Sequence, residues 1–240
     1  MSDETPTVVL VHGAFADASS WNGVIELLQA EGVKVTAPAN PLRGIAIDSA
    51  YIASVLAETA GPVLAVGHSY GGAVITNAAT NAANVVGLVY VAAFAPDERE
   101  VLGQITGDSK DSVLDTALVP LHYPAPDGGE ALVEFAIDPA KFRDAFAADL
   151  PAEQTAIMAA TQRPVAEAAF SEPSSAPAWK QLKSWAVVAS SDTAAGADVV
   201  RSMAERASAT ITEIEASHVV MISKPRAVTD VILEALAAVG

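Results

Sequence analysis

Short runs of apolar residues recur along the first part of the chain, each bounded by turn-forming residues. Thr7–Val11 and Val85–Ala92 are nearly continuous apolar stretches, the pattern typical of parallel strands buried on both faces. Further strands are predicted over Val33–Ala37 and Pro62–Val66. This rhythm indicates a series of strand–helix units.

The segments between these strands favour helices. Helices are expected over residues 20–28, over residues 48–59 with Asp48 as the cap, and over residues 73–81 after Ser69. The first two mix apolar and polar positions, and the third is rich in alanine. Each predicted strand is therefore followed by a segment that can cross back over the sheet.

The same alternation returns at the end of the chain. Strands are predicted over Trp185–Ser190 and Thr210–Ile214, with helices over residues 197–207 and 226–238. Six strands alternating with helices predict an α/β fold with a doubly wound, mainly parallel sheet flanked by helices. In such a fold, ligands bind at the carboxyl ends of the strands.

Residues 96–183 lack this alternation, and we interpret them as an insertion. Proline- and glycine-rich loops occur at residues 124–129 and 172–177, and helices fit residues 140–150 and 153–161. We expect a core formed by residues 1–95 and 184–240, with residues 96–183 forming a mostly helical cap. A run of ordinary core helices is the alternative.

Composition narrows the classes of function. The 240 residues favour one domain, and 13 basic against 29 acidic residues give a net charge of −16. Such a chain repels phosphate backbones and anionic lipid surfaces, so neither nucleic acid nor a membrane is an expected partner. No apolar run is long enough to span a bilayer, and Met1–Pro6 is acidic where a secretory signal is basic. A cytoplasmic location is the expectation.

The chain contains no cysteine and four histidines, His12, His68, His122 and His218. Cysteine chemistry is therefore excluded, and the histidines lack paired metal-ligand spacing. No metal or cofactor is expected.

Residues 67–72, Gly-His-Ser-Tyr-Gly-Gly, carry the clearest chemical signal. The motif lies between a predicted strand and a predicted helix, which is the setting of a nucleophile elbow. In that turn a strained backbone exposes the serine, and the flanking glycines let strand and helix approach closely. Ser69 is the candidate nucleophile. The alternative is a glycine-rich turn whose serine only caps the helix.

A serine hydroxyl needs a base and a carboxylate that orients the base. His218 follows the last predicted strand and Asp192 follows the penultimate one, so both belong to the carboxyl edge of the sheet. We expect Ser69, Asp192 and His218 to form a triad. Asp97, also at the end of a strand, is the main rival for the acid, and Asp198 is another.

The remaining histidines and loops have weaker interpretations. His122 lies in the insertion, and His68 is expected to pack beneath the elbow. The backbone amides of Ala14 and Tyr70 are expected to form the oxyanion hole, with His12 and Gly13 shaping the loop. Phe15 and Trp21 are candidates for substrate binding, although either residue could belong to the core.

Taken together, His12-Gly13-Ala14, the Gly67–Gly71 elbow, Asp192 and Ser217-His218 resemble the α/β-hydrolase family over essentially the whole chain. Residues 7–14 followed by Ser20-Trp21 look most like the branch that contains plant methyl esterases, hydroxynitrile lyases and bacterial hydrolases. The lyases carry a lysine after the catalytic histidine and a threonine in the oxyanion loop. Val219 and Gly13 stand at those positions here, which disfavours cyanohydrin cleavage.

The resemblance implies a serine esterase or lactonase that acts on a small, mostly uncharged substrate through an acyl-enzyme. Cofactor-free haloperoxidases, which form peracids, and binding proteins built on the hydrolase fold are the alternatives. The cap is expected to determine the specificity. A homodimer is also a possibility, because dimers are common.

Overall fold

The computed structural model describes residues 5–240, and across this range six strands form one parallel sheet. The strand order is β2-β1-β3-β4-β8-β9. The strands are β1 (Thr7–Val11), β2 (Val35–Thr36), β3 (Val63–His68), β4 (Val85–Val91), β8 (Ser184–Ala189) and β9 (Thr210–Ile214). The predicted six-stranded parallel sheet is confirmed, and each strand lies at or close to its expected position.

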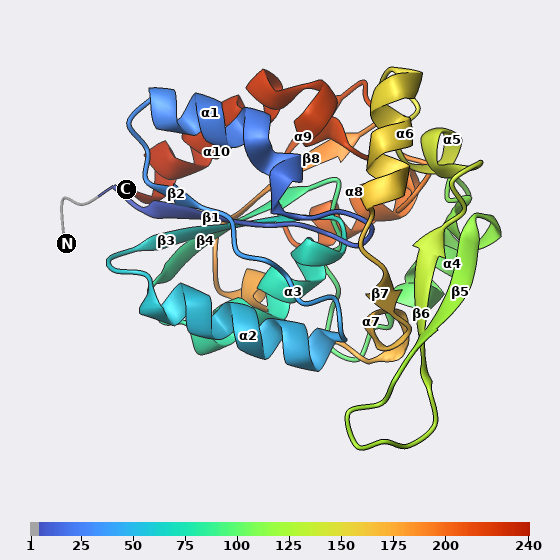
Figure 1. The fold of residues 1–240 in the computed structure, drawn as a ribbon. Helices are drawn as coiled ribbons and strands as arrows, with labels where there is room; N and C mark the ends of the chain where they lie inside the picture. The colour runs from blue at the N-terminus through green and yellow to red at the C-terminus, as the bar shows by residue number, and fades with distance from the viewer. Residues whose placement is uncertain (1–4) are drawn as a thin grey trace.

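Helices cover both faces of the sheet, as Figure 1 shows. On one face α1 (Asn22–Ala30) packs against α10 (Pro225–Val239), and on the other α2 (Ile45–Glu58) packs against α3 (Tyr70–Ala78). Near the carboxyl edge lie α8 (Ala197–Arg206) and the short α9 (Val220–Ser223). Because helices cover both faces, the central strands are mostly apolar, and β3 and β8 are buried throughout.

One predicted cap is wrong. Helix α2 begins at Ile45 after Gly44, whose φ of 137° suits glycine, and Asp48 lies inside the first turn. The buried Asp48 carboxylate accepts hydrogen bonds from the Arg43 amide at 3.0 Å and from the Tyr70 hydroxyl at 2.8 Å. Asp48 therefore joins the start of α2 to the elbow instead of capping the helix.

Residues 96–183, called the cap below, contain both of the predicted helical regions and a small sheet that the sequence pattern did not predict. Helices α5 (Phe142–Phe146) and α6 (Ala152–Thr161) fall where helices were expected. The antiparallel sheet has the order β5-β6-β7, and the loop at residues 124–129 connects β5 to β6. The other elements are β5 (Leu118–Tyr123), β6 (Leu132–Ile137), β7 (Val165–Ala166), α4 (Leu102–Asp108) and α7 (Ala168–Ser171).

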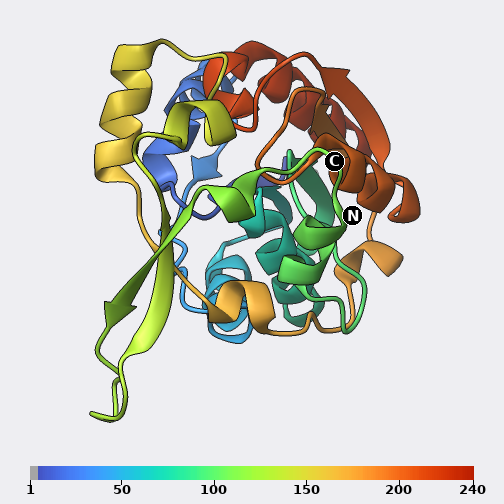
Figure 2. The same cartoon turned by 90° about the vertical axis from the view of Figure 1, so that its right-hand side faces the viewer.

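The hairpin of β5 and β6 extends away from the body of the molecule (Figures 1 and 2). Four short 3-10 helices complete the described chain. These are η1 (Ala18–Trp21), η2 (Ala79–Asn81), η3 (Leu114–Thr116) and η4 (Ala178–Lys180).

Polar contacts attach the cap to the core at separate points. The Arg43 guanidinium contacts the Glu134 carboxylate of β6 at 2.6 Å, and the Glu172 carboxylate accepts the Ala46 amide at 3.0 Å. The second contact satisfies an amide in the first turn of α2 and places negative charge at that end of the helix, where it is favourable.

No helix among residues 5–240 is long and apolar enough to cross a bilayer. The acidic start used in the sequence prediction, Met1 to Glu4, lies outside the described residues.

Candidate active site

Ser69 occupies a strained turn between β3 and α3. Its backbone has φ 53° and ψ −124°, a conformation that non-glycine residues rarely adopt. The turn is held by the Ser69 amide, which donates to the Val91 carbonyl at 3.3 Å, and by the Gly72 amide, which donates to the Ser69 carbonyl at 3.0 Å. The predicted strand–turn–helix context of the elbow is present.

Glycines are required on both sides of Ser69. A Cβ atom at Gly67 would lie 2.5 Å from the Gly71 carbonyl oxygen, and one at Gly71 would collide with the Val11 carbonyl. The strand, the helix and β1 therefore meet at distances that leave no room for a side chain.

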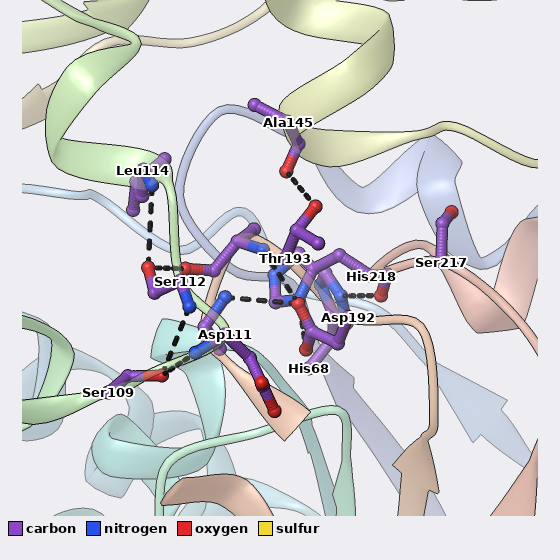
Figure 3. Close-up of polar contacts among 12 residues, drawn as sticks. His68, Ser109, Asp111, Ser112, Leu114, Ala145, Asp192, Thr193, Ser217 and His218 are labelled. Carbon is purple, nitrogen blue, oxygen red and sulfur yellow. Dashed lines mark hydrogen bonds and ion pairs between the residues drawn. The ribbon is translucent and has the colours of Figure 1, made fainter. Parts of the chain in front are cut away.

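His218 and Asp192 form a buried pair at the carboxyl ends of the adjacent strands β9 and β8. His218 Nδ1 lies 2.8 Å from Asp192 Oδ2, and each side chain is only 1% exposed. The other carboxylate oxygen accepts the amides of Ala194 at 2.9 Å and Ala195 at 3.1 Å. Figure 3 shows the two side chains pointing toward each other. The carboxylate is thus fixed in place and orients the imidazole ring.

His68 joins the elbow to the His218 loop. Its Nε2 donates to the His218 carbonyl oxygen at 3.0 Å, and the two imidazole centroids lie 4.7 Å apart. Because a carbonyl only accepts, the proton of His68 must be on Nε2. Burial, together with the neighbouring His218, holds the pKa of His68 well below its ordinary value. His68 is therefore neutral, and it packs beneath the elbow as the sequence predicted.

Cap helix α5 covers the same pair. The Phe146 ring centroid is 5.0 Å from that of His218, and the Thr193 hydroxyl donates to the Asp144 carbonyl at 3.3 Å. The Ser217 hydroxyl makes a short hydrogen bond to the Asp149 carboxylate. These contacts reach both the loop that carries Asp192 and the loop that carries His218. Figure 3 shows a further contact, of the Thr193 hydroxyl with the Ala145 carbonyl at 3.5 Å.

The loop after β1 passes next to Ser69, as the oxyanion prediction requires. A Cβ atom at Gly13 would lie 2.7 Å from Ser69 Cβ and 3.3 Å from His68 Nδ1. The next residue, Ala14, is buried. Tyr70 begins α3, and because its hydroxyl donates to Asp48, its side chain is fixed in the core. Only the backbone amide of Tyr70 is suited to the predicted role.

His12 shapes this loop from below. Its ring is fully buried, and its Nε2 accepts the Asn40 amide at 3.0 Å, which places the proton on Nδ1, 2.9 Å from the Gly13 carbonyl. Burial lowers the pKa of His12 to about 4, against the opposing effect of the Gly13 carbonyl. A neutral, structural His12 agrees with the sequence interpretation.

Phe15 and Trp21, the two candidates for substrate binding, have different surroundings. Phe15 lines a cavity of about 420 Å³. Its ring packs edge-on against that of Phe146, with the two centroids 6.1 Å apart. Trp21 is fully buried and does not line that cavity. Its ring packs edge-on against the His68 ring, with the two centroids 6.3 Å apart. The structure thus places Trp21 in the core behind His68.

The rival residues have other partners. Asp97 forms an ion pair with Lys180 at 2.5 Å, and Asp198 accepts the Ser109 hydroxyl at 2.5 Å. His122 lies exposed on β5, opposite Val133. Asp192 is the acid that lies beside His218.

The residues missed by the sequence analysis belong mainly to the cap. Phe142 and Phe146 lie one helical turn apart on α5, and no local sequence pattern indicates which ring covers His218. The Ser217–Asp149 contact also joins segments that are distant in sequence. Among residues 5–240, no group of three or more His, Asp or Glu side chains is arranged to hold a metal ion.

A parallel sheet with a nucleophile-elbow turn and a buried histidine–aspartate pair at its carboxyl edge defines a hydrolase-type framework. Residues 8–231 match the sequence model of the Alpha/beta hydrolase family. The chain belongs to this family, which confirms the family resemblance seen in its motifs. No curated protein sequence gave a match.

Solved structures share the fold over nearly the whole chain. Polyneuridine aldehyde esterase has a TM-score of 0.80 at 23% identity, with 97% of this chain and 99% of that chain covered. Tomato methylketone synthase I, complexed with 2-tridecanone, has a TM-score of 0.79 at 20% identity, with 99% and 100% covered. A pyrethroid hydrolase from Sphingobium faniae JZ-2 has a TM-score of 0.74 at 20% identity, with 97% and 98% covered. These structures show that the fold is shared, and the hydrolase family itself rests on the sequence match.

Proposed function

We propose that this protein is a serine hydrolase that cleaves a carboxylic ester or lactone of a small, mostly uncharged substrate. The observation that carries the proposal is the buried His218–Asp192 pair, attached through His68 to the strained turn that holds Ser69. Backbone strain and a desolvated, ordered imidazole–carboxylate pair both cost stability. A catalytic role explains why one fold maintains them side by side.

In this mechanism Ser69 Oγ attacks the carbonyl carbon while His218 Nε2 accepts the hydroxyl proton. Asp192, paired with Nδ1 of the same ring, stabilises the imidazolium and fixes its orientation. The imidazolium then gives the proton to the leaving alkoxide, and an acyl-enzyme remains. Water, deprotonated by His218, attacks the acyl carbon, and the imidazolium returns this proton to Ser69 Oγ as the acid is released.

The oxyanion that forms in both steps is assigned to the amides of Ala14 and Tyr70. The Ala14 loop lies against Ser69 because Gly13 packs on the serine Cβ, and the Tyr70 amide belongs to the first residue of α3. Amides at the start of a helix carry the favourable end of its dipole. Removing one such donor typically costs about 3 kcal/mol of transition-state stabilisation.

The test is hydrolysis of p-nitrophenyl esters from acetate to octanoate by the wild type, by Ser69→Ala and by Ser54→Ala. Ser54 is an exposed helix serine whose hydroxyl donates only to the Tyr51 carbonyl, so Ser54→Ala is the matched control. We expect turnover to vanish in Ser69→Ala and to persist in Ser54→Ala. Equal turnover by all three proteins would refute the proposal.

A further inference from the structure

The proposed catalytic groups are enclosed. Ser69 is 6% exposed, and Asp192 and His218 are each 1% exposed. An ester must therefore reach them through a passage that the surrounding side chains cover. Two parts of the cap, α5 and α6, lie nearby, and their contacts with the core differ.

Helix α5 is firmly attached. It is bound through Thr193 to the loop of Asp192 and, through Asp149 in the segment that follows it, to Ser217 next to His218. Opening the cap on this side would break these hydrogen bonds and remove Phe146 from His218. Entry past α5 would thus disturb the pair that performs the chemistry.

Helix α6 instead borders a cavity of about 420 Å³ formed with the segment after β1, the start of α1 and α9. Phe15 and Met158 lie on its wall, together with Ile222, four residues beyond His218. The cavity is thus lined by Phe15, which directly follows the proposed oxyanion donor Ala14.

Two aromatic rings, Phe15 and Phe146, connect the wall of this cavity to His218. Phe15 lines the cavity, and its ring centroid lies 6.1 Å from that of Phe146. The Phe146 centroid in turn lies 5.0 Å from that of His218. Phe15 also has a φ of 60°, a rare conformation for an aromatic residue and one that concentrates at functional positions.

The side chains that line the cavity indicate the polarity and charge of the ligand that it would bind. Apolar side chains form much of the wall, and Ile157 stands 67% exposed among the lining residues. Among the described residues that line it, Asp17 is the one ionisable group, and its hydrogen bond with Ser19 lowers its pKa. Because the one ionisable side chain on this wall carries a negative charge, an anionic ligand is disfavoured.

We propose that this cavity binds the uncharged apolar part of the substrate, an alkyl chain or ring, and that Phe15 and Phe146 part to admit the ester group to Ser69. The inference rests on the proposed ester hydrolysis. It adds a specificity-determining residue, Met158, which is half-buried on α6 and lies on the cavity wall.

The experiment compares Met158→Trp with Ala156→Trp, which adds the same ring at an exposed position of α6 outside the cavity. We expect Met158→Trp to lower kcat/KM for p-nitrophenyl octanoate by about tenfold or more while changing the value for acetate by less than about twofold. Ala156→Trp should leave both values unchanged, and Met158→Ala should shift the preference toward longer chains. An equal loss on both esters in Met158→Trp would overturn the assignment.

A binding measurement tests the cavity without catalysis. Calorimetric titration of the wild type should detect octanamide and not octanoate, and Met158→Trp should lose the amide signal while Ala156→Trp keeps it. Binding of octanamide that is the same in all variants would overturn the cavity assignment. Absence of ester turnover together with Met158-dependent amide binding would instead refute the hydrolase proposal and leave the cavity assignment standing.

Discussion

His68 donates a hydrogen bond from Nε2 to the backbone carbonyl of His218 at 3.0 Å, so the residue before the proposed nucleophile holds the residue proposed as its base. The two come from opposite parts of the chain, at the end of β3 and in the loop after β9. The spacing between nucleophile and base therefore depends on one buried, neutral imidazole.

We expect His68→Phe to impair both stability and catalysis. It keeps a ring beside His218 but leaves the buried carbonyl without this donor, which costs about 1–3 kcal/mol. His68→Gln retains an amide donor and should recover part of the loss. Urea denaturation measures the effect on stability, and separate values of kcat and KM for ester hydrolysis measure the effect on catalysis. We expect kcat to fall about tenfold or more with KM little changed, and wild-type values in both variants would contradict this role.

Stability should decrease as the pH falls from about 6.5 to 4. In the unfolded chain His12 binds a proton near its ordinary pKa of 6.5, whereas in the folded protein burial lowers that pKa to about 4. The unfolded state thus binds more protons in this window, and folding loses on the order of 3 kcal/mol from His12. The lowered pKa of His68 acts in the same direction.

Urea denaturation from neutral pH downward measures this slope. His12→Asn should show a shallower dependence on pH than the wild type, whatever its stability at neutral pH. His122→Asn, altered at an exposed position, is the control and should retain the wild-type slope. A slope that is the same in His12→Asn would show that other groups produce it.

Replacing Asp192 with asparagine should lower kcat by about four orders of magnitude. The amide carries no charge to stabilise the imidazolium, and because the Ala194 and Ala195 amides hold its oxygen, its NH2 group faces Nδ1 and favours the wrong tautomer. Asp97→Asn removes only the partly exposed ion pair with Lys180, worth at most about 1 kcal/mol of stability. Its ester hydrolysis should match the wild type. A larger loss of kcat in Asp97→Asn than in Asp192→Asn would reverse the assignment of the acid.

Gly67→Ala should disrupt the elbow, because the added Cβ meets the Gly71 carbonyl oxygen at 2.5 Å. We expect the free energy of unfolding to fall by about 2 kcal/mol or more, since backbone atoms cannot move aside as a flexible side chain can. Gly107→Ala is the control on α4, where the new Cβ projects into open space among the described residues. It should be neutral or stabilising by up to about 1 kcal/mol, as thermal or chemical denaturation would show.

The core could be predicted because its strands are buried on both faces. The predicted ranges Thr7–Val11 and Thr210–Ile214 agree with β1 and β9, since apolar runs bounded by turn residues leave little freedom in assignment. Chain order on such a sheet also predicted Asp192 and His218 at the same carboxyl edge, and the structure adds that β8 and β9 are neighbours. Their contact follows from topology that the sequence pattern already indicates.

The cap was harder to predict for a physical reason. Strand β5 is largely exposed, with Val119 and Leu121 among its exposed apolar residues, so its pattern does not separate a core face from a solvent face. The position of Phe146 over His218 depends on how α5 docks, which no local periodicity encodes. Asp48 shows the same limit, because its partner Tyr70 comes from another element.

The attachment of α5 affects how this protein could diversify. A different cap grafted onto the same sheet would have to replace both the aromatic ring on His218 and the carboxylate that accepts from Ser217. In this chain the cap is therefore not an exchangeable module, because recombination at its boundaries would also disturb the loop that carries His218. If the proposed site is correct, point substitution on α6 is the less disruptive route to new substrates.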